Sequence, residues 1–216
     1  MKRTAAFALL PLTALMLSGC TLFPSAADHD KAAADTLKNS FQARGIAKLD
    51  RLTQDQANAE CATADATGKP LDEKMSKVIE ESNMKTVKWP TDGKFLGDWK
   101  EGEKIAQSGR GLTWTDTATT ENGGKCYNCH QISKEEISFG TLGPSLYNYG
   151  KLRGVTDPNS AGGKAIVEYT WGKLWNARAY NACSQMPRVG HMAILNQKQI
   201  QDVMALLLDP ASPVNK

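Results

Sequence analysis

The sequence Cys126-Tyr127-Asn128-Cys129-His130 decides the fold of this protein. Two thiols separated by two residues can each bond to one vinyl group of a haem, and the histidine that follows can bind the iron. The competing interpretations are a CxxC redox pair and half of a zinc site. A zinc site requires a second Cys/His pair at ligand spacing, and a thioredoxin-like site requires a βαβ pattern nearby. The sequence has neither, so we predict one covalent haem c attached to Cys126 and Cys129, with His130 as an axial ligand.

The first 19 residues have the features of an export signal. Lys2 and Arg3 precede an apolar run, 5–17, that is too short to span a bilayer. Leu17-Ser18-Gly19-Cys20 resembles the lipobox of bacterial lipoproteins, which would leave Cys20 as a lipidated first residue. Ser25-Ala26-Ala27 offers an alternative site for ordinary signal peptidase. We favour the lipobox and expect a periplasmic protein, with lipid at Cys20 as its candidate membrane anchor.

Composition and charge place the chain among soluble globular proteins. It has 216 residues, of which 41% are hydrophobic and 23% are charged. Loss of residues 1–19 removes Lys2 and Arg3 but no acidic residue, so the net charge falls from +3 to +1. We therefore predict no nucleic-acid partner. From Asp98 onward 13 basic residues stand against 11 acidic ones, and this balance suits a lasting protein interface better than a brief, electrostatically steered encounter.

Two cysteines remain once Cys20, Cys126 and Cys129 have been assigned. Cys61 and Cys183 belong to an exported chain, and an oxidising compartment favours a disulfide between them. Two buried free thiols are the alternative. A bridge would tie the N-terminal region to the segment just before Met186.

The sequence patterns predict an all-α protein with an N-terminal extension, 20–97, and a haem domain, 98–216. Within the extension, the small polar residues of 21–35 are typical of a tether. Three short helices should follow the tether. Their signals are Leu37 and Phe41 four residues apart, a capping box at Thr53 and Gln56 that leads to Cys61, and an apolar stripe at Met75, Val78 and Ile79. A turn-rich stretch, 63–70, separates the last two.

Three helices should form the haem domain. After a turn at 89–93, the first begins near Asp98 and stops near Gly109, and a loop rich in threonine and glycine leads from it to the haem motif. The second covers 164–175. Asn196 and Gln199 cap the third, whose apolar residues recur at helical spacing until Pro210.

The second axial ligand determines what the iron can do. A vacant position admits gases, peroxide or substrate, whereas a methionine sulfur closes the site and raises the reduction potential. Met186 precedes a proline in an irregular loop, and such a loop can direct a side chain at the iron without helical constraint. We choose Met186, with His191 and Met192 as the alternatives. Met75, Met84 and Met204 are better explained as packing residues.

The ring nitrogen of His130 that does not bind iron needs an acceptor to fix its tautomer. The stretch Leu142-Gly143-Pro144-Ser145-Leu146 offers a backbone carbonyl, because its proline stiffens a turn. An ordinary turn without this role is the alternative.

These motifs resemble, in their order, the class I cytochrome c fold. The attachment motif comes first, then Gly143-Pro144-Ser145-Leu146, then Met186-Pro187 before a closing helix. In detail, Asn-Cys-His-Gln-Ile at 128–132, Leu-Gly-Pro-Ser-Leu at 142–146 and Cys-Ser-Gln-Met-Pro-Arg-Val-Gly at 183–190 are similar to SoxX. SoxX is the smaller haem subunit of the SoxAX cytochrome complex of bacterial sulfur oxidation. The chain departs from this pattern at Val189, where we would expect phenylalanine.

The resemblance implies a haem c ligated by His130 and Met186, with the Pro144 carbonyl supporting His130. It also implies a heterodimer with a SoxA-like cytochrome subunit. That complex, an L-cysteine S-thiosulfotransferase, joins thiosulfate oxidatively to a cysteine of the SoxYZ carrier protein. The SoxX haem takes the electrons and passes them to a downstream acceptor cytochrome, and we expect no catalytic residue in this chain.

Two other functions share the haem chemistry. One is a free-standing class I cytochrome c that carries electrons to a terminal oxidase or another respiratory partner. The other is a ligand-binding or peroxidase haem, which requires a vacant iron position. The Met186-Pro187 arrangement argues against a vacant position.

Overall fold

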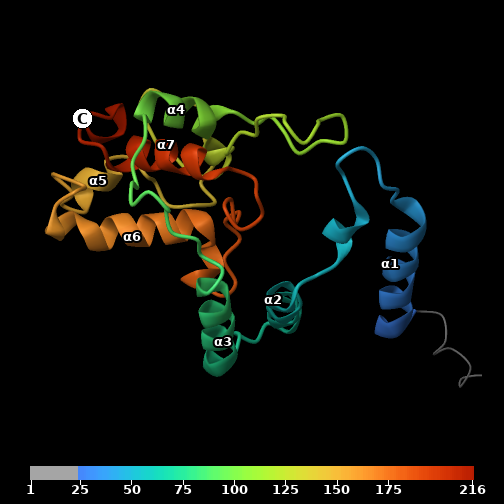
Figure 1. The fold of residues 1–216 in the computed structure, drawn as a ribbon. Coiled ribbons are helices and arrows are strands. Elements are labelled where there is room, and N and C mark those ends of the chain that lie inside the picture. Colours follow the sequence, from blue (N-terminus) through green and yellow to red (C-terminus); the bar gives the residue numbers. More distant parts are fainter. Residues whose placement is uncertain (1–23) are drawn as a thin grey trace, which may run out of the picture. The chain divides into compact units, whose positions relative to one another are not determined.

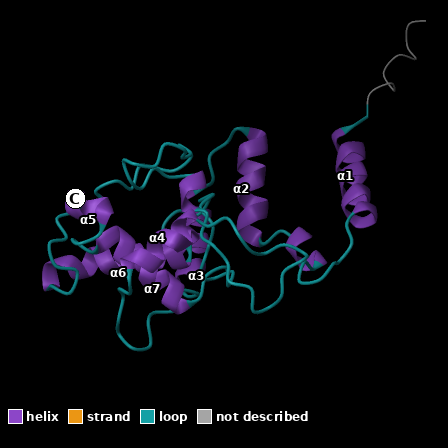
Figure 2. Cartoon of the chain, turned by 90° about the horizontal axis from the view of Figure 1, so that it is seen from above, coloured by secondary structure: helices purple, strands orange, loops and turns teal. Residues whose placement is uncertain are grey.

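A computed structural model describes residues 24–216, so the predicted export signal and Cys20 lie outside the described residues. All regular elements in this part of the chain are helical, as predicted, and none is a strand (Figures 1 and 2). The α-helices are α1 (Ala26–Ser40), α2 (Gln56–Thr67), α3 (Glu73–Met84), α4 (Trp99–Gln107), α5 (Tyr149–Leu152), α6 (Ala161–Trp175) and α7 (Gln197–Leu208). The chain forms two compact units, and the boundary between them follows Gln42. Residues 43–97 therefore belong to the same unit as the predicted haem domain.

Helix α1 corrects our prediction of a tether at 21–35. Ser25 caps the helix: its hydroxyl accepts from the Asp28 N–H, and the Asp28 carboxylate accepts from the Ser25 N–H in return. Five alanines in the helix supply high intrinsic helix propensity. Alanine-rich composition was therefore a helix signal here, although no residue of α1 is buried.

Helix α7 forms the centre of the second unit. Every residue from Ile200 to Leu208 is buried, and α4, α5 and α6 all pack against this helix (Figure 1). Its predicted capping box is confirmed: Asn196 and Gln199 exchange side-chain and backbone hydrogen bonds at the N-terminus. Gly102 allows the close crossing with α4, because a Cβ at that position would overlap the Asp202 carbonyl of α7.

Helix α2 begins at a different cap from the one we predicted. Asp55, not Thr53, is its N-cap, and the carboxylate accepts from the Asn58 N–H at 2.8 Å. The helix also runs further than expected and ends at Gly68, whose φ of 64° is left-handed. The predicted turn-rich stretch is therefore helical as far as Thr67. The Asp55 carboxylate also binds two distant arginines, Arg178 and Arg188.

Two tryptophans of α6 form hydrogen bonds to the backbone of the residues that follow α3. The indole of Trp171 donates to the Lys88 carbonyl at 2.9 Å, and the indole of Trp175 donates to the Thr86 carbonyl at 3.1 Å. Asn176, which has no exposed surface, donates to both Asn83 and Thr86. The segment after α3 is therefore joined to α6 through buried polar contacts.

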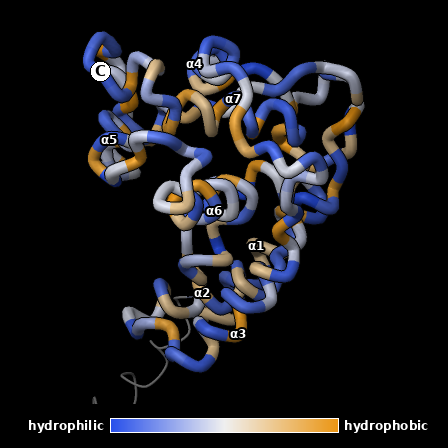
Figure 3. The backbone as a smooth tube through the Cα atoms, turned by 60° about the vertical axis from the view of Figure 1, so that its left-hand side comes forward, coloured by the Kyte–Doolittle hydropathy of each residue, from blue (hydrophilic) through white to orange (hydrophobic). Residues whose placement is uncertain are grey.

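Hydrophobic and hydrophilic residues alternate in short segments along the described chain (Figure 3). No helix within residues 24–216 combines the length and the apolar character needed to cross a membrane.

Candidate functional site

The attachment motif folds as one tight turn directly after the loop that follows α4. Cys126–Asn128 is a single 3₁₀ turn, and the N–H groups of Cys129 and His130 both donate to the Cys126 carbonyl, at 3.1 and 2.9 Å. The N–H of Gly124 donates to the Ile105 carbonyl at 2.8 Å, which attaches the start of the motif to α4. The helix predicted before the motif therefore positions its first cysteine.

The side chains of Cys126 and Cys129 are half-buried, and neither forms a disulfide. Burial raises the pKa of the Cys126 thiol to about 11. Redox-active CxxC motifs depend on the opposite shift, because the thiolate is the reacting form.

His130 makes the contact for which the sequence offered a candidate turn. Its Nδ1 lies 2.7 Å from the Pro144 carbonyl oxygen, so the Nδ1–H tautomer donates this hydrogen bond and leaves Nε2 as the basic nitrogen. Gly143 makes this geometry possible, because a Cβ at that position would overlap the imidazole ring. The ring is thus fixed from the Nδ1 side, which is the usual arrangement of a histidine that binds a metal through Nε2.

We expect Gly143→Ala to displace His130, because the added methyl group and the imidazole would occupy the same space. Overpacking of this kind costs roughly 1–3 kcal/mol. The free energy of unfolding in urea should fall by that amount, and the protected Nδ1 proton of His130 should disappear from the NMR spectrum.

Gly162→Ala is the matched control, because a Cβ there meets only the Ser160 hydroxyl, at 3.9 Å, on the exposed start of α6. Alanine there should be neutral or stabilise the helix by about 0.5–1 kcal/mol. A Gly143→Ala protein with unchanged stability and a protected His130 proton would contradict the assigned geometry.

The candidates for the second axial ligand differ in how much of each side chain is buried. Met186 is half-buried and packs against the same apolar core as Cys126. Met192, by contrast, is 52% exposed, and His191 is also exposed. Met204 is fully buried within α7. Of the candidates, Met186 is the one that combines an irregular loop with contact to the core on which the attachment motif also packs.

The loop that carries Met186 is held by residues that sequence analysis did not identify. Arg178 and Arg188 both bind the Asp55 carboxylate, at 3.0 and 2.8 Å, and Arg178 also donates to the Asn58 side chain. Partial burial by itself would raise the pKa of Asp55. The Asn58 N–H and the two arginines outweigh burial and hold the pKa below its ordinary value of 3.8. Two arginines in an irregular segment have no periodic signal, so their common partner is visible only in three dimensions.

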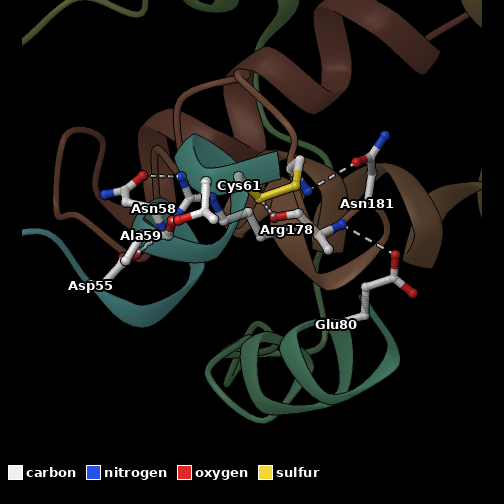
Figure 4. The surroundings of a disulfide bond; sticks show 10 residues. Asp55, Asn58, Ala59, Cys61, Glu80, Arg178 and Asn181 are labelled. Atoms are coloured by element: carbon white, nitrogen blue, oxygen red, sulfur yellow. Dashed lines mark hydrogen bonds and ion pairs between the residues drawn. A yellow bond between two sulfur atoms is a disulfide. The ribbon is translucent and has the colours of Figure 1, made fainter. Parts of the chain in front are cut away.

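A disulfide joins Cys61 of α2 to Cys183, three residues before Met186. Its surroundings include the Asp55–Arg178 contact and α3, from which the Glu80 carboxylate accepts a hydrogen bond from the Ala182 N–H at 3.2 Å (Figure 4). Ala182 also packs in a small apolar cluster with Ala57 and Ile79. Helices α2 and α3 therefore both contact the segment just before Met186.

No family model matches the chain. It is 34% identical over 134 residues to a protein of Aquifex aeolicus (strain VF5) named as an uncharacterized lipoprotein. The matched region covers 61% of this chain and 59% of that protein, so the chain spans about three-fifths of the length of this relative. Within residues 24–216, no cluster of three or more His, Cys, Asp or Glu side chains is arranged to hold a metal ion.

Proposed function

We propose that this protein is a monohaem c-type cytochrome with a class I fold in residues 98–216, and that it transfers single electrons. The observation that carries the proposal is the 2.7 Å contact between His130 Nδ1 and the Pro144 carbonyl, next to the paired thiols of Cys126 and Cys129. This contact prepares Nε2 to bind iron.

The residues present fit a covalent haem. Cys126 and Cys129 would hold it through thioether bonds, while His130 and Met186 would be the axial ligands of iron. The haem would supply a one-electron change at iron, at a potential that a methionine ligand raises. The chain itself contributes positioning: the Pro144 carbonyl fixes the imidazole, Gly143 leaves space for it, and the apolar core beside Cys126 and Met186 limits access of water.

Within this class, we propose the electron-transfer subunit of a SoxAX complex. The support is the sequence similarity of three segments, 128–132, 142–146 and 183–190, to SoxX. The near balance of charge from Asp98 onward is a second support. The partners would be a SoxA-like cytochrome subunit, the SoxYZ carrier protein reached through the complex, and a downstream acceptor cytochrome. The thiosulfotransferase chemistry would take place on the SoxA-like subunit, with this chain accepting the electrons released.

A lipidated Cys20 would keep the protein at a membrane surface of the periplasm without a spanning helix. The lipobox at 17–20 supports this location, and so does the name of the Aquifex relative.

Isolation of the protein from native extract tests the proposed complex. We expect it to co-purify with a second haem-containing subunit, and we expect thiosulfate with the carrier protein to reduce its haem. A haem-containing protein that behaves as a lone monomer and is reduced only by other cytochromes would instead support the free-standing shuttle.

A further inference from the structure

Helix α2 contacts both ends of the segment that contains Met186. At one end, Cys183 is bonded to Cys61 of α2. At the other end, Arg188 binds Asp55, the N-cap of the same helix, at 2.8 Å. Four residues lie between these two attachments, and Met186 is one of them.

Few other contacts within the described structure hold these four residues: the Ser184 N–H donates to the Asn181 carbonyl at 3.0 Å, and Met186 packs against the apolar core. The N–H of Met186 donates to the Ser184 hydroxyl at 3.3 Å, a long contact within the loop itself. The segment has no helix or strand, because residues 183–188 lie between the 3₁₀ turn Ala177–Ala179 and α7. Fixing a residue of a free loop costs conformational entropy. Attachment of both ends to one rigid helix reduces the number of conformations that Met186 can adopt.

The ion pair at Asp55 is partly buried, with 41% of the Asp55 side chain exposed. The Arg188 side chain is only 16% exposed, and Asp55 is already fixed by the Asn58 N–H and by Arg178, whose side chain is 10% exposed. A carboxylate that is held in place by other groups loses little entropy when it binds a further arginine. The pair therefore fixes the position of Arg188, two residues after Met186.

We propose that α2 is a positioning element for Met186, in which the Cys61–Cys183 disulfide and the Asp55–Arg188 ion pair together hold the methionine sulfur in place. The proposal rests on the proposed function, because it assigns the extension a task in haem ligation. It predicts that loosening either attachment raises the rate at which Met186 leaves the iron, out of proportion to the loss of global stability.

Arg188→Gln in the holoprotein tests the ion pair. Loss of a partly exposed pair should accelerate the displacement of Met186 by cyanide, in the ferric protein, roughly fivefold. The sulfur-to-iron charge-transfer band should weaken in parallel. Arg188→Lys keeps the charge and should restore part of the wild-type rate.

Two variants separate positioning from stability. Arg178→Gln removes the other arginine from Asp55 but leaves Arg188 and the disulfide in place, so it should lower the urea midpoint and accelerate cyanide binding clearly less than Arg188→Gln does. Lys164→Gln removes one positive charge from an exposed pair with Glu168 and should change neither quantity.

The wild-type protein provides a second measurement in case Arg188→Gln does not fold. Its disulfide is reduced with a dithiol, the freed thiols are alkylated, and the iron is reoxidised with ferricyanide. The thioether bonds of haem c survive this treatment, and cyanide binding should again accelerate.

The outcomes distinguish this proposal from the proposed function. Equal cyanide rates in all variants, or rates that follow the urea midpoint in both arginine variants, would overturn the positioning role while a methionine-ligated haem remains. Absence of haem or of the charge-transfer band in the wild-type protein would instead overturn the proposed function.

Discussion

We expect the double variant Cys126→Ala/Cys129→Ala to contain no covalently bound haem. The two thioether bonds are the only covalent attachment that the motif offers, and axial ligation alone does not survive denaturation. After denaturing electrophoresis, the wild-type band should stain for haem and the variant band should not. Each single variant should retain one thioether bond and stain less strongly.

The chain contains a matched control for this experiment. Cys61→Ala/Cys183→Ala removes the same number of cysteines, but these two form the disulfide between α2 and the Met186 segment. Its band should still stain for haem, although its stability should fall by about 2–5 kcal/mol, as is typical for loss of a native disulfide. Haem staining in the Cys126→Ala/Cys129→Ala protein would contradict the assigned attachment.

Met186→Ala should lower the reduction potential and open the iron to added ligands. Thioether ligation favours the reduced iron, and axial ligands tune haem potentials over a range of about 0.8 V, so we expect a fall on the order of 100–200 mV. Potentiometric titration measures the fall. The sulfur-to-iron charge-transfer band should vanish, and cyanide should bind without a slow displacement step.

Met192→Ala is the corresponding control. Met192 lies in the same part of the chain, but 52% of it is exposed, so its loss should leave potential and band unchanged. A Met186→Ala protein that keeps its band, with loss of the band in Met192→Ala, would move the ligand to Met192. Retention of the band in both variants would refute both assignments.

Local signals in the sequence were sufficient for the helices that have strong caps. Asn196 and Gln199 predicted the start of α7, because their side chains satisfy backbone N–H groups at its N-terminus. A helix was also expected to begin near Asp98, and in the structure Asp98 caps α4. The helix predicted at 164–175 agrees with α6 to within three residues, because α6 begins at Ala161 after a Ser160 cap.

Tertiary contacts decided what the sequence could not. Thr53 with Gln56 matches the capping-box pattern, yet Asp55 caps α2. Its carboxylate also binds Arg178 and Arg188, which lie more than 120 residues away in the sequence. Neither arginine has a pattern that marks it as buried. Asn176, which is fully buried between α6 and the end of α3, was missed for the same reason.

The candidate site was predictable to the extent that its chemistry lies in short motifs. The attachment motif, the turn at 142–146 and the Met186-Pro187 pair could each be read from adjacent residues. The contact between His130 and the Pro144 carbonyl joins two of these motifs. The attachment of the Met186 segment to α2 had no such signal, because it depends on how the extension packs.

The mass of the peptide that contains Cys126 to His130 tests the central claim most directly. The protein is purified from native cells, treated with a thiol-alkylating reagent under denaturing conditions, and digested. We predict a peptide that is heavier than its sequence by one haem and carries no alkyl group, because both thiols are in thioether bonds. A peptide of the sequence mass with two alkylated cysteines would contradict the assignment of this protein as a c-type cytochrome.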